Sequence, residues 1–132
     1  MNINLITNTN ENPTPEGYEN VLINDIDKIP ANICTNLVLN DTLNYLTNNQ
    51  FQLLLGKIRH GGTIAIASPD AMEMAKALYW GQINLEKFSS LIIDNKSQHS
   101  LVEIKNFFEQ SGYIIEAASI NEFSFFIKAK RP

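Results

Sequence analysis

The stretch that decides the fold of this chain reads Lys57-Ile58-Arg59-His60-Gly61-Gly62-Thr63-Ile64-Ala65-Ile66-Ala67-Ser68-Pro69-Asp70. It contains the basic end of one helix, a glycine turn, a β-branched apolar run and the start of a second helix. This order is typical of a crossover unit in a parallel sheet. The stretch therefore predicts an α/β fold, with residues 63–67 as a strand that is covered on both faces.

Length and composition favour one intracellular domain, residues 1–132. The chain has 132 residues, of which 44% are hydrophobic, so it can bury a core without disulfides or metal ions. A formal charge of −4 argues against nucleic acid as a partner. The single cysteine, Cys34, excludes an intramolecular disulfide and is expected to be a buried small hydrophobe. No apolar run is long enough for a membrane span, no metal-ligand spacing is present, and we expect a cytoplasmic protein.

Apolar runs upstream of the deciding stretch predict three strands, at residues 3–7, 21–23 and 37–39. A polar tract with Pro13, Pro15 and Gly17 separates the first two. Asp41 is expected to cap a short helical turn over residues 42–46, which Asn48 and Asn49 would end. Phe51, Leu54, Leu55 and Ile58 then form one stripe of a helix that ends in Lys57 and Arg59 and is stopped by Gly61 and Gly62.

Downstream of the stretch, two helices have capping signals at their starts. Asp70 with Glu73 precedes a helix that ends near Trp80, and Ser100 with Glu103 precedes a helix that ends at Gly112. Residues 82–99 fit no single period and are expected to be a surface excursion with a short helical piece. Residues 113–117 and 123–129 are joined by a short polar tract, which predicts an antiparallel hairpin.

This order of elements resembles the class I S-adenosylmethionine-dependent methyltransferases, and in particular small, trimmed members of that family. The residues that carry the resemblance are Ile3-Asn4-Leu5-Ile6, Asn12-Pro13, Pro15-Glu16-Gly17-Tyr18-Glu19-Asn20-Val21, Gly61-Gly62 before a strand that ends in Ser68-Pro69-Asp70, and the closing segment from Ser111-Gly112-Tyr113 to Lys130-Arg131-Pro132. The resemblance implies a three-layer α/β sandwich, with a mostly parallel, Rossmann-like sheet and an antiparallel C-terminal hairpin.

The resemblance also implies a site for S-adenosylmethionine at the carboxyl ends of the strands. Asp25 would accept hydrogen bonds from the ribose hydroxyls, with Asp27 as the competing register. Asn40 and Asp41 would lie near the methyl donor. The family has a Gly-x-Gly turn after the first strand, where the cofactor approaches the backbone closely. This chain instead has Thr7-Asn8-Thr9-Asn10, and its first glycine is Gly17. The resemblance implies that the loop from Thr7 to Asn10 lies near the methionine part of the cofactor.

Each candidate also has an ordinary structural explanation. Asp25 could be a solvated loop acid, and Asn40 with Asp41 could cap the turn that follows. Ser68 and Asp70 face the expected cleft, but capping explains them. Tyr79, beside Trp80, could form an aromatic wall for a substrate or pack in the core.

The two histidines are predicted to be surface residues. His60, before the glycine pair, is expected to complement a helix dipole at the opposite end of the sheet. His99 is a candidate on the substrate side, because its imidazole could work near neutral pH. A surface histidine in a loop is the favoured interpretation, because the sequence fixes no carboxylate or nucleophile beside it.

Two functions are therefore compatible with the sequence. The first is a methyltransferase-like protein that uses S-adenosylmethionine, with an acceptor and catalytic residues that the sequence does not identify. The second is a catalytically inactive domain of the same fold, which serves as a binding or assembly module for a second copy, a protein partner or a small ligand. The missing glycine turn favours the second function, and the polar residues at the strand ends favour the first.

Overall fold

A computed structural model describes residues 1–8 and 13–132, and within these residues six strands form one mixed sheet. The elements are, in order, β1 (Asn2–Ile6), β2 (Glu19–Leu22), the 3-10 helix η1 (Ile23–Lys28), β3 (Cys34–Asn40), the 3-10 helix η2 (Leu43–Tyr45), α1 (Asn48–Leu55), β4 (Ile58–Pro69), α2 (Ala71–Tyr79), α3 (Leu85–Ile92), α4 (Leu101–Gln110), β5 (Ile114–Asn121) and β6 (Ser124–Lys130).

The sheet has the strand order β2-β1-β3-β4-β6-β5. Strands β1 to β4 are parallel, whereas β6 runs antiparallel to both β4 and β5. The predicted α/β fold, with a mostly parallel sheet and an antiparallel C-terminal hairpin, is confirmed. Strand order reverses at β1, because the chain moves from β1 to β2 on one side and then returns to β3 on the other.

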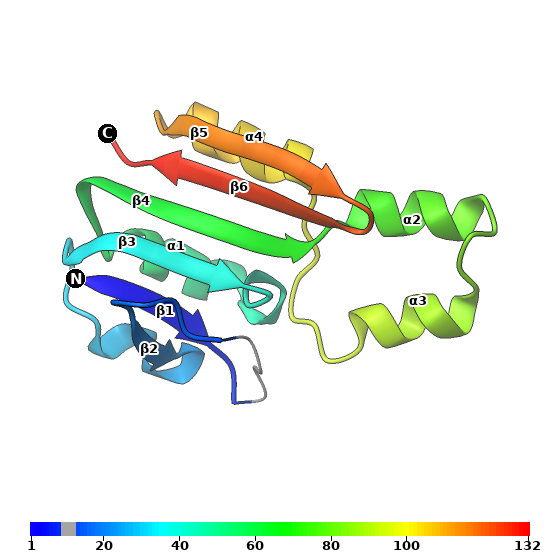
Figure 1. The fold of residues 1–132 in the computed structure, drawn as a ribbon, viewed down its shortest axis with the longest axis horizontal. Helices are drawn as coiled ribbons and strands as arrows, with labels where there is room; N and C mark the ends of the chain where they lie inside the picture. The colour runs from blue at the N-terminus through cyan, green and yellow to red at the C-terminus, as the bar shows by residue number, and fades with distance from the viewer. Residues whose placement is uncertain (9–12) are drawn as a thin grey trace.

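The hydrophobic core lies between the sheet and the helices that Figure 1 shows behind it, α1 and α4. Phe51 of α1 contacts Phe107 and Phe108 of α4, with ring centroids 5.9 and 6.4 Å apart. The opposite face of the sheet carries polar and small side chains together with apolar Val38 and Phe126. Asn4 donates a hydrogen bond to Asn20 at 2.9 Å, and Asn20 donates to Thr14 at 2.7 Å. The connection before β2 therefore runs along this second face.

Burial along β4 corrects the expectation that both faces of this strand are covered. Ile64 and Ile66 are buried, whereas Ala65 and Ala67 on the other face are only partly buried. The helices pack on the first face. On the second face Ala65 lies beside Val38 of β3, and Ala67 lies beside the exposed Phe126 of β6. Alternation of burial, which is common in antiparallel sheets, therefore occurs in β4, which is parallel to β3 on one side and antiparallel to β6 on the other.

The helix expected to end at Gly61 is shorter than predicted. It begins after Thr47, which forms a capping box with Gln50, and ends at Leu55, so Asn48 and Asn49 start this helix rather than break it. Ile58 already belongs to β4, where it is fully buried and pairs with Cys34 of β3. Gly61 and Gly62 lie in an irregular part of the strand, between the pairs Cys34–Ile58 and Asn36–Thr63. Tertiary pairing thus overrides a local helix-stop signal.

Other local predictions are confirmed or adjusted in detail. The short turn after β3 is present as η2, but the residue at its N-cap position is Thr42 rather than Asp41. The Thr42 hydroxyl donates to the Leu5 carbonyl at 2.9 Å, and Asp41 has a positive φ of 57°. Asp70 and Ser100 cap α2 and α4 as predicted. The excursion over residues 82–99 contains α3, and α2 and α3 extend beyond the strand ends in Figure 1. No helix in the described part of the chain is long and apolar enough to cross a bilayer.

Gly62 is the position where the irregular part of β4 tolerates no side chain. A Cβ there would lie 2.7 Å from the Cys34 carbonyl oxygen and 2.9 Å from the Arg59 carbonyl oxygen, and both are backbone atoms. We expect Gly62→Ala to lower the free energy of unfolding by about 1–3 kcal/mol through overpacking. Urea denaturation followed by circular dichroism measures this change.

Gly56→Ala is the matched control for Gly62→Ala. Gly56 has helical dihedral angles, φ −69° and ψ −11°, so alanine fits without strain. We expect this variant to be neutral or to gain up to about 1 kcal/mol. Equal loss of stability in both variants would contradict the role assigned to Gly62.

Candidate functional site

A hollow lies where the carboxyl ends of β1 and β2 meet the segment after β3. We call it the switch-point hollow; it is lined by Thr7, Asn8, Leu22, Ile23, Asn24, Tyr45 and Lys96. The residues that line it come from the end of β2 and the positions directly after β1 and β2, from η2, and from the loop before α4. In open parallel sheets ligands bind beyond the carboxyl ends of strands, at the point where strand order reverses. The hollow occupies this position.

A long-range contact between η2 and the loop that precedes α4 determines the positions of two residues that line the switch-point hollow, Tyr45 and Lys96. The backbone N–H groups of Lys96 and Ser97 donate to the Asn44 carbonyl at 2.8 and 3.2 Å. The Asn44 side-chain amide donates to the Asn95 oxygen at 2.8 Å. These bonds fix the loop against η2. Lys96 thereby brings a positive charge to the hollow that Tyr45 and Asn24 also line.

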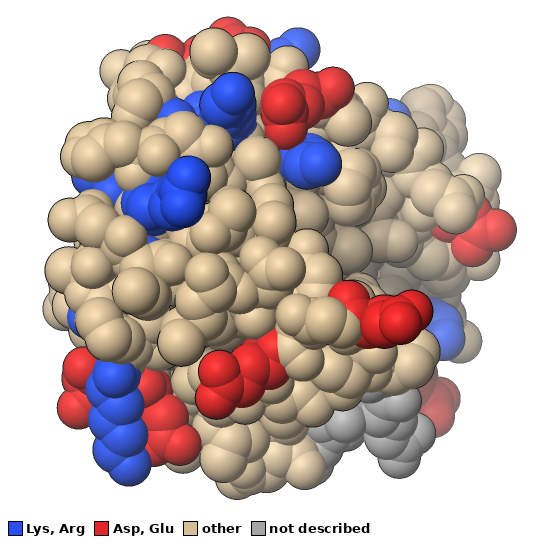
Figure 2. All heavy atoms as spheres, turned by 60° about the vertical axis from the view of Figure 1, so that its left-hand side comes forward, with Lys and Arg blue, Asp and Glu red and all other residues tan. Residues whose placement is uncertain are grey.

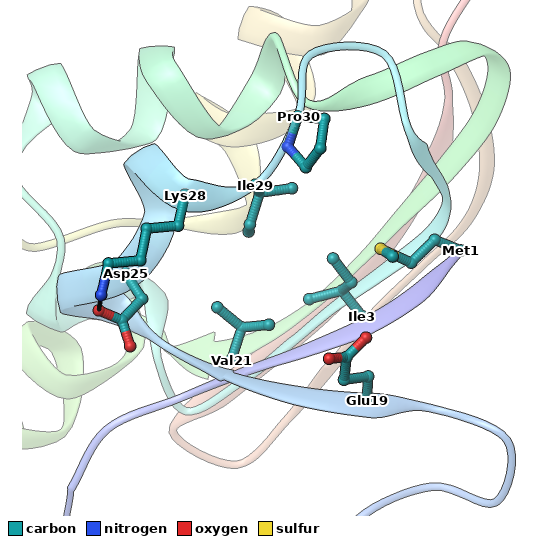
Figure 3. A pocket seen from close by; sticks show the side chains of 8 residues that line it. All are labelled: Met1, Ile3, Glu19, Val21, Asp25, Lys28, Ile29 and Pro30. Atoms are coloured by element: carbon teal, nitrogen blue, oxygen red, sulfur yellow. Dashed lines mark ion pairs between the residues drawn. The ribbon is translucent and has the colours of Figure 1, made fainter.

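The structure places Thr7 and Asn8 of the predicted loop in the switch-point hollow, and Thr9 and Asn10 lie outside the described residues. Asp25 lies elsewhere. It lines a separate hollow between η1 and the start of the sheet, together with Ile3, Val21 and Ile29. Figure 3 shows its carboxylate turned toward Lys28, and the two charged groups are 3.2 Å apart. Asn24, one residue earlier, is the residue of this segment that lines the switch-point hollow.

Asn40 and Asp41 lie at the carboxyl end of β3, as predicted, outside the lining of either hollow. The Asp41 backbone N–H donates to the Ala67 carbonyl at 2.8 Å, which joins the ends of β3 and β4. Asp27, the alternative to Asp25, is an exposed residue of η1.

The candidates near β4 and α2 have structural roles or are exposed. Ser68 is fully buried and donates to the Pro69 carbonyl at 3.1 Å. Asp70 is 2% exposed, and its carboxylate accepts from the N–H groups of Met72, Glu73 and Leu101. Tyr79 is 81% exposed and contacts the Trp80 ring edge-to-face, so the expectation of an aromatic in the core is wrong for this residue.

His99 was predicted to be a surface residue, but the structure shows that it is buried. It is only 8% exposed, its Nε2 lies 2.7 Å from the Ser97 hydroxyl, and its Nδ1 lies 3.8 Å from the Glu103 carboxylate. Burial lowers the pKa of this imidazole, and the Glu103 charge opposes that shift only in part. The spacing of His99 and Glu103, four residues apart at a helix start, was the signal that could have revealed the pair.

The other predicted histidine, His60, belongs to β4 rather than to a helix end. Its Nδ1 lies 3.0 Å from the Pro132 carbonyl oxygen, at the amino-terminal edge of the parallel strands.

Cys34 is fully buried, as predicted, and burial raises the pKa of its thiol. On the face shown in Figure 2, basic and acidic side chains are scattered rather than gathered into a patch of one sign.

Comparisons with known proteins place the fold. No family model matches the chain, and no curated protein matches it. Among solved structures, an O-methyltransferase family protein from Burkholderia thailandensis matches with a TM-score of 0.56 at 15% identity, over 86% of this chain and 36% of that one. A S-adenosylmethionine-dependent methyltransferase from Mesorhizobium loti matches with a TM-score of 0.58 at 16% identity, over 89% of this chain and 72% of that one.

The protein has a methyltransferase-like fold. A third match with this fold is an O-methyltransferase from neocarzinostatin biosynthesis, solved with S-adenosylmethionine and 2-hydroxy-5-methyl naphthoic acid, with a TM-score of 0.54 at 17% identity, over 87% of this chain and 34% of that one. This methyltransferase-like chain thus spans about a third of the length of the two O-methyltransferases. The switch-point hollow lies at the carboxyl ends of its parallel strands.

The lowered pKa of His99 predicts how stability depends on pH. Unfolding returns the imidazole to its ordinary pKa of 6.5, so below that value the unfolded state binds more protons than the folded state. The free energy of unfolding should therefore fall as the pH drops from 6.5 toward the folded-state pKa of His99. Urea denaturation at a series of pH values, with His99→Gln and the exposed control His60→Gln, measures the effect. An unchanged slope in His99→Gln would contradict it.

Proposed function

We propose that this methyltransferase-like protein binds S-adenosylmethionine in the switch-point hollow and acts as a methyltransferase. The observation that supports the proposal is the position of the hollow, at the reversal of strand order, with polar side chains from four separate segments around it. The acceptor of the methyl group is not assigned by these residues.

The donor set of the hollow suits the chemistry of this cofactor. An Asn24 amide can hydrogen-bond to both ribose hydroxyls, since it carries donors and an acceptor. The ammonium of Lys96 would balance the carboxylate of the methionine part, and the half-buried Tyr45 ring would pack against the adenine. Thr7 and Asn8 would border the methionine part. The cofactor supplies an electrophilic methyl group, and the residues of the chain would align it with an acceptor.

A catalytically inactive module is the second candidate. Thr7 and Asn8 carry side chains where a glycine turn would leave room, and the hollow formed by the described residues encloses about 220 Å³, less than a typical site for a small molecule. Exposed Tyr79 and Trp80 at the end of α2 would suit assembly with a second copy or a protein partner. This candidate predicts that the cofactor does not bind.

Calorimetric titration with S-adenosylmethionine and S-adenosylhomocysteine tests the proposal. We expect binding of both, and we expect Asn24→Ala and Lys96→Ala each to weaken it about tenfold, because each loses one hydrogen bond or ion pair worth about 1.4 kcal/mol. Asp25→Ala is the matched control and should bind as the unmodified protein does.

Two outcomes would contradict this assignment. Loss of binding in Asp25→Ala, with binding retained in Asn24→Ala, would move the ligand to the hollow beside η1. A lack of heat and of thermal stabilisation at millimolar concentrations of both compounds would remove the enzyme and leave the inactive module.

A further inference from the structure

A second hollow lies on the helical side of the sheet, between the amino-terminal halves of α1 and α4. We call it the His99 hollow; it is lined by Asn48, Phe51, Gln52, His99, Glu103, Ile104 and Phe107. Positions 48, 51 and 52 share one face of α1, as 103, 104 and 107 do on α4. The rings of Phe51 and Phe107 are in contact, with centroids 5.9 Å apart. An apolar wall therefore adjoins two amides, a carboxylate and an imidazole.

Hydrogen bonds around Ser97 determine which nitrogen of His99 carries the proton. The Ser97 hydroxyl lies 2.8 Å from the Leu46 carbonyl oxygen, 3.3 Å from the Leu43 carbonyl oxygen and 2.7 Å from His99 Nε2. A hydroxyl has one hydrogen, and a carbonyl can only accept. The hydroxyl therefore donates to a carbonyl and accepts from Nε2–H. This arrangement leaves Nδ1 of the neutral imidazole as a bare acceptor.

Nδ1 of His99 has no hydrogen-bond partner among the described residues, although the side chain is more than nine-tenths buried. The nearest polar group, the Glu103 carboxylate, is 3.8 Å away and is also an acceptor. Two acceptors at this separation cannot bond to each other, but a donor placed between them satisfies both. Nδ1 of His99 therefore needs a hydrogen-bond donor, and the described residues do not provide one.

We propose that the His99 hollow binds a small primary ammonium ion with an apolar body, held between His99 Nδ1 and the Glu103 carboxylate. An ammonium group carries three donors, which suit the imidazole nitrogen, the carboxylate and an amide oxygen of Asn48 or Gln52. The Phe51 and Phe107 rings would pack against the apolar body, and aromatic faces also attract a cation.

The lining residues discriminate against other ligands. The hollow encloses about 150 Å³, which suits an alkyl or benzyl ammonium rather than a nucleotide. One imidazole and one carboxylate face it, fewer than the three protein ligands of a typical catalytic zinc site, and no cluster of metal-ligating side chains occurs in the described part of the chain. The Glu103 side chain is 68% exposed and attracts a cation, whereas a neutral alcohol gains no charge interaction with it.

Acidification should compete with the ligand, because a protonated His99 would itself donate to Glu103. Glu103 on α4 is the charged group that acts on the imidazole, and the residues of α1 that face the hollow are uncharged. The site does not depend on S-adenosylmethionine. Lys96 lines the switch-point hollow and His99 lines this one, so the same loop contributes a side chain to each hollow.

Titration with benzylammonium chloride at pH 7.5, followed by calorimetry, tests the proposal, with benzyl alcohol as the neutral match. We expect the cation to bind and the alcohol not to bind. His99→Gln keeps a donor for Ser97 but removes Nδ1, and Glu103→Gln removes the charge, so each should weaken binding at least tenfold. His60→Gln and Glu109→Gln, which alter exposed residues, are the matched controls and should bind unchanged.

A second readout uses the unmodified protein, which keeps the test valid if a variant fails to fold. Nitrogen-15 spectra of the imidazoles should show the Nδ1 signal of His99 moving on saturation with benzylammonium, while the His60 signals stay in place. Nα-acetyl-lysine methylamide, titrated in parallel, carries the same ammonium on a peptide-like body, and tighter binding would identify a lysine side chain as the source. Equal binding of benzyl alcohol, unchanged affinity in His99→Gln, or an unmoved Nδ1 signal would each overturn the proposal.

Discussion

The buried carboxylate of Asp70 joins three parts of the structure at the carboxyl end of β4. One oxygen accepts from the N–H groups of Met72 and Glu73 at the start of α2, and the other accepts from Leu101 at the start of α4. The Asp70 backbone N–H donates to the Phe123 carbonyl, so the β5–β6 hairpin is tied to the same point. Hydrogen bonds from N–H groups to a buried charge are among the stronger ones in proteins.

Because of this junction, the excursion through α2 and α3 leaves the sheet and returns to it at one place. The Ala71 N–H donates to the His99 carbonyl at 2.8 Å, which fixes the last residues of the excursion beside the first. The bonds from Asn44 then hold the preceding loop against η2. Both hollows depend on these contacts, since the loop supplies Lys96 to one of them and His99 to the other.

The features that the sequence predicts correctly are local. Alternating or continuous apolar residues locate the strands, and Asp70 and Ser100 are recognisable as caps because a cap needs only the next three residues. The end of α1 is wrong because Ile58 looks like a helical residue until its pairing with Cys34 is known. The burial of His99 follows from contacts with residues about 50 positions away, through Ser97 and the η2 carbonyls, and no local pattern contains them.

Part of the candidate site could be predicted from the sequence, and part could not. The segments after β1 and β2 could be assigned to the carboxyl edge of the sheet. The sequence favoured Asp25 or Asp27 there, whereas Asn24, one residue before Asp25 in η1, lines the switch-point hollow. Tyr45 and Lys96 come together only through the folded loop. Two-dimensional amide NMR with S-adenosylhomocysteine tests the central claim most directly. We expect shifts confined to residues 7–8, 22–24, 45 and 96, whereas shifts confined to residues 25–30, or no shifts, would contradict binding in the switch-point hollow.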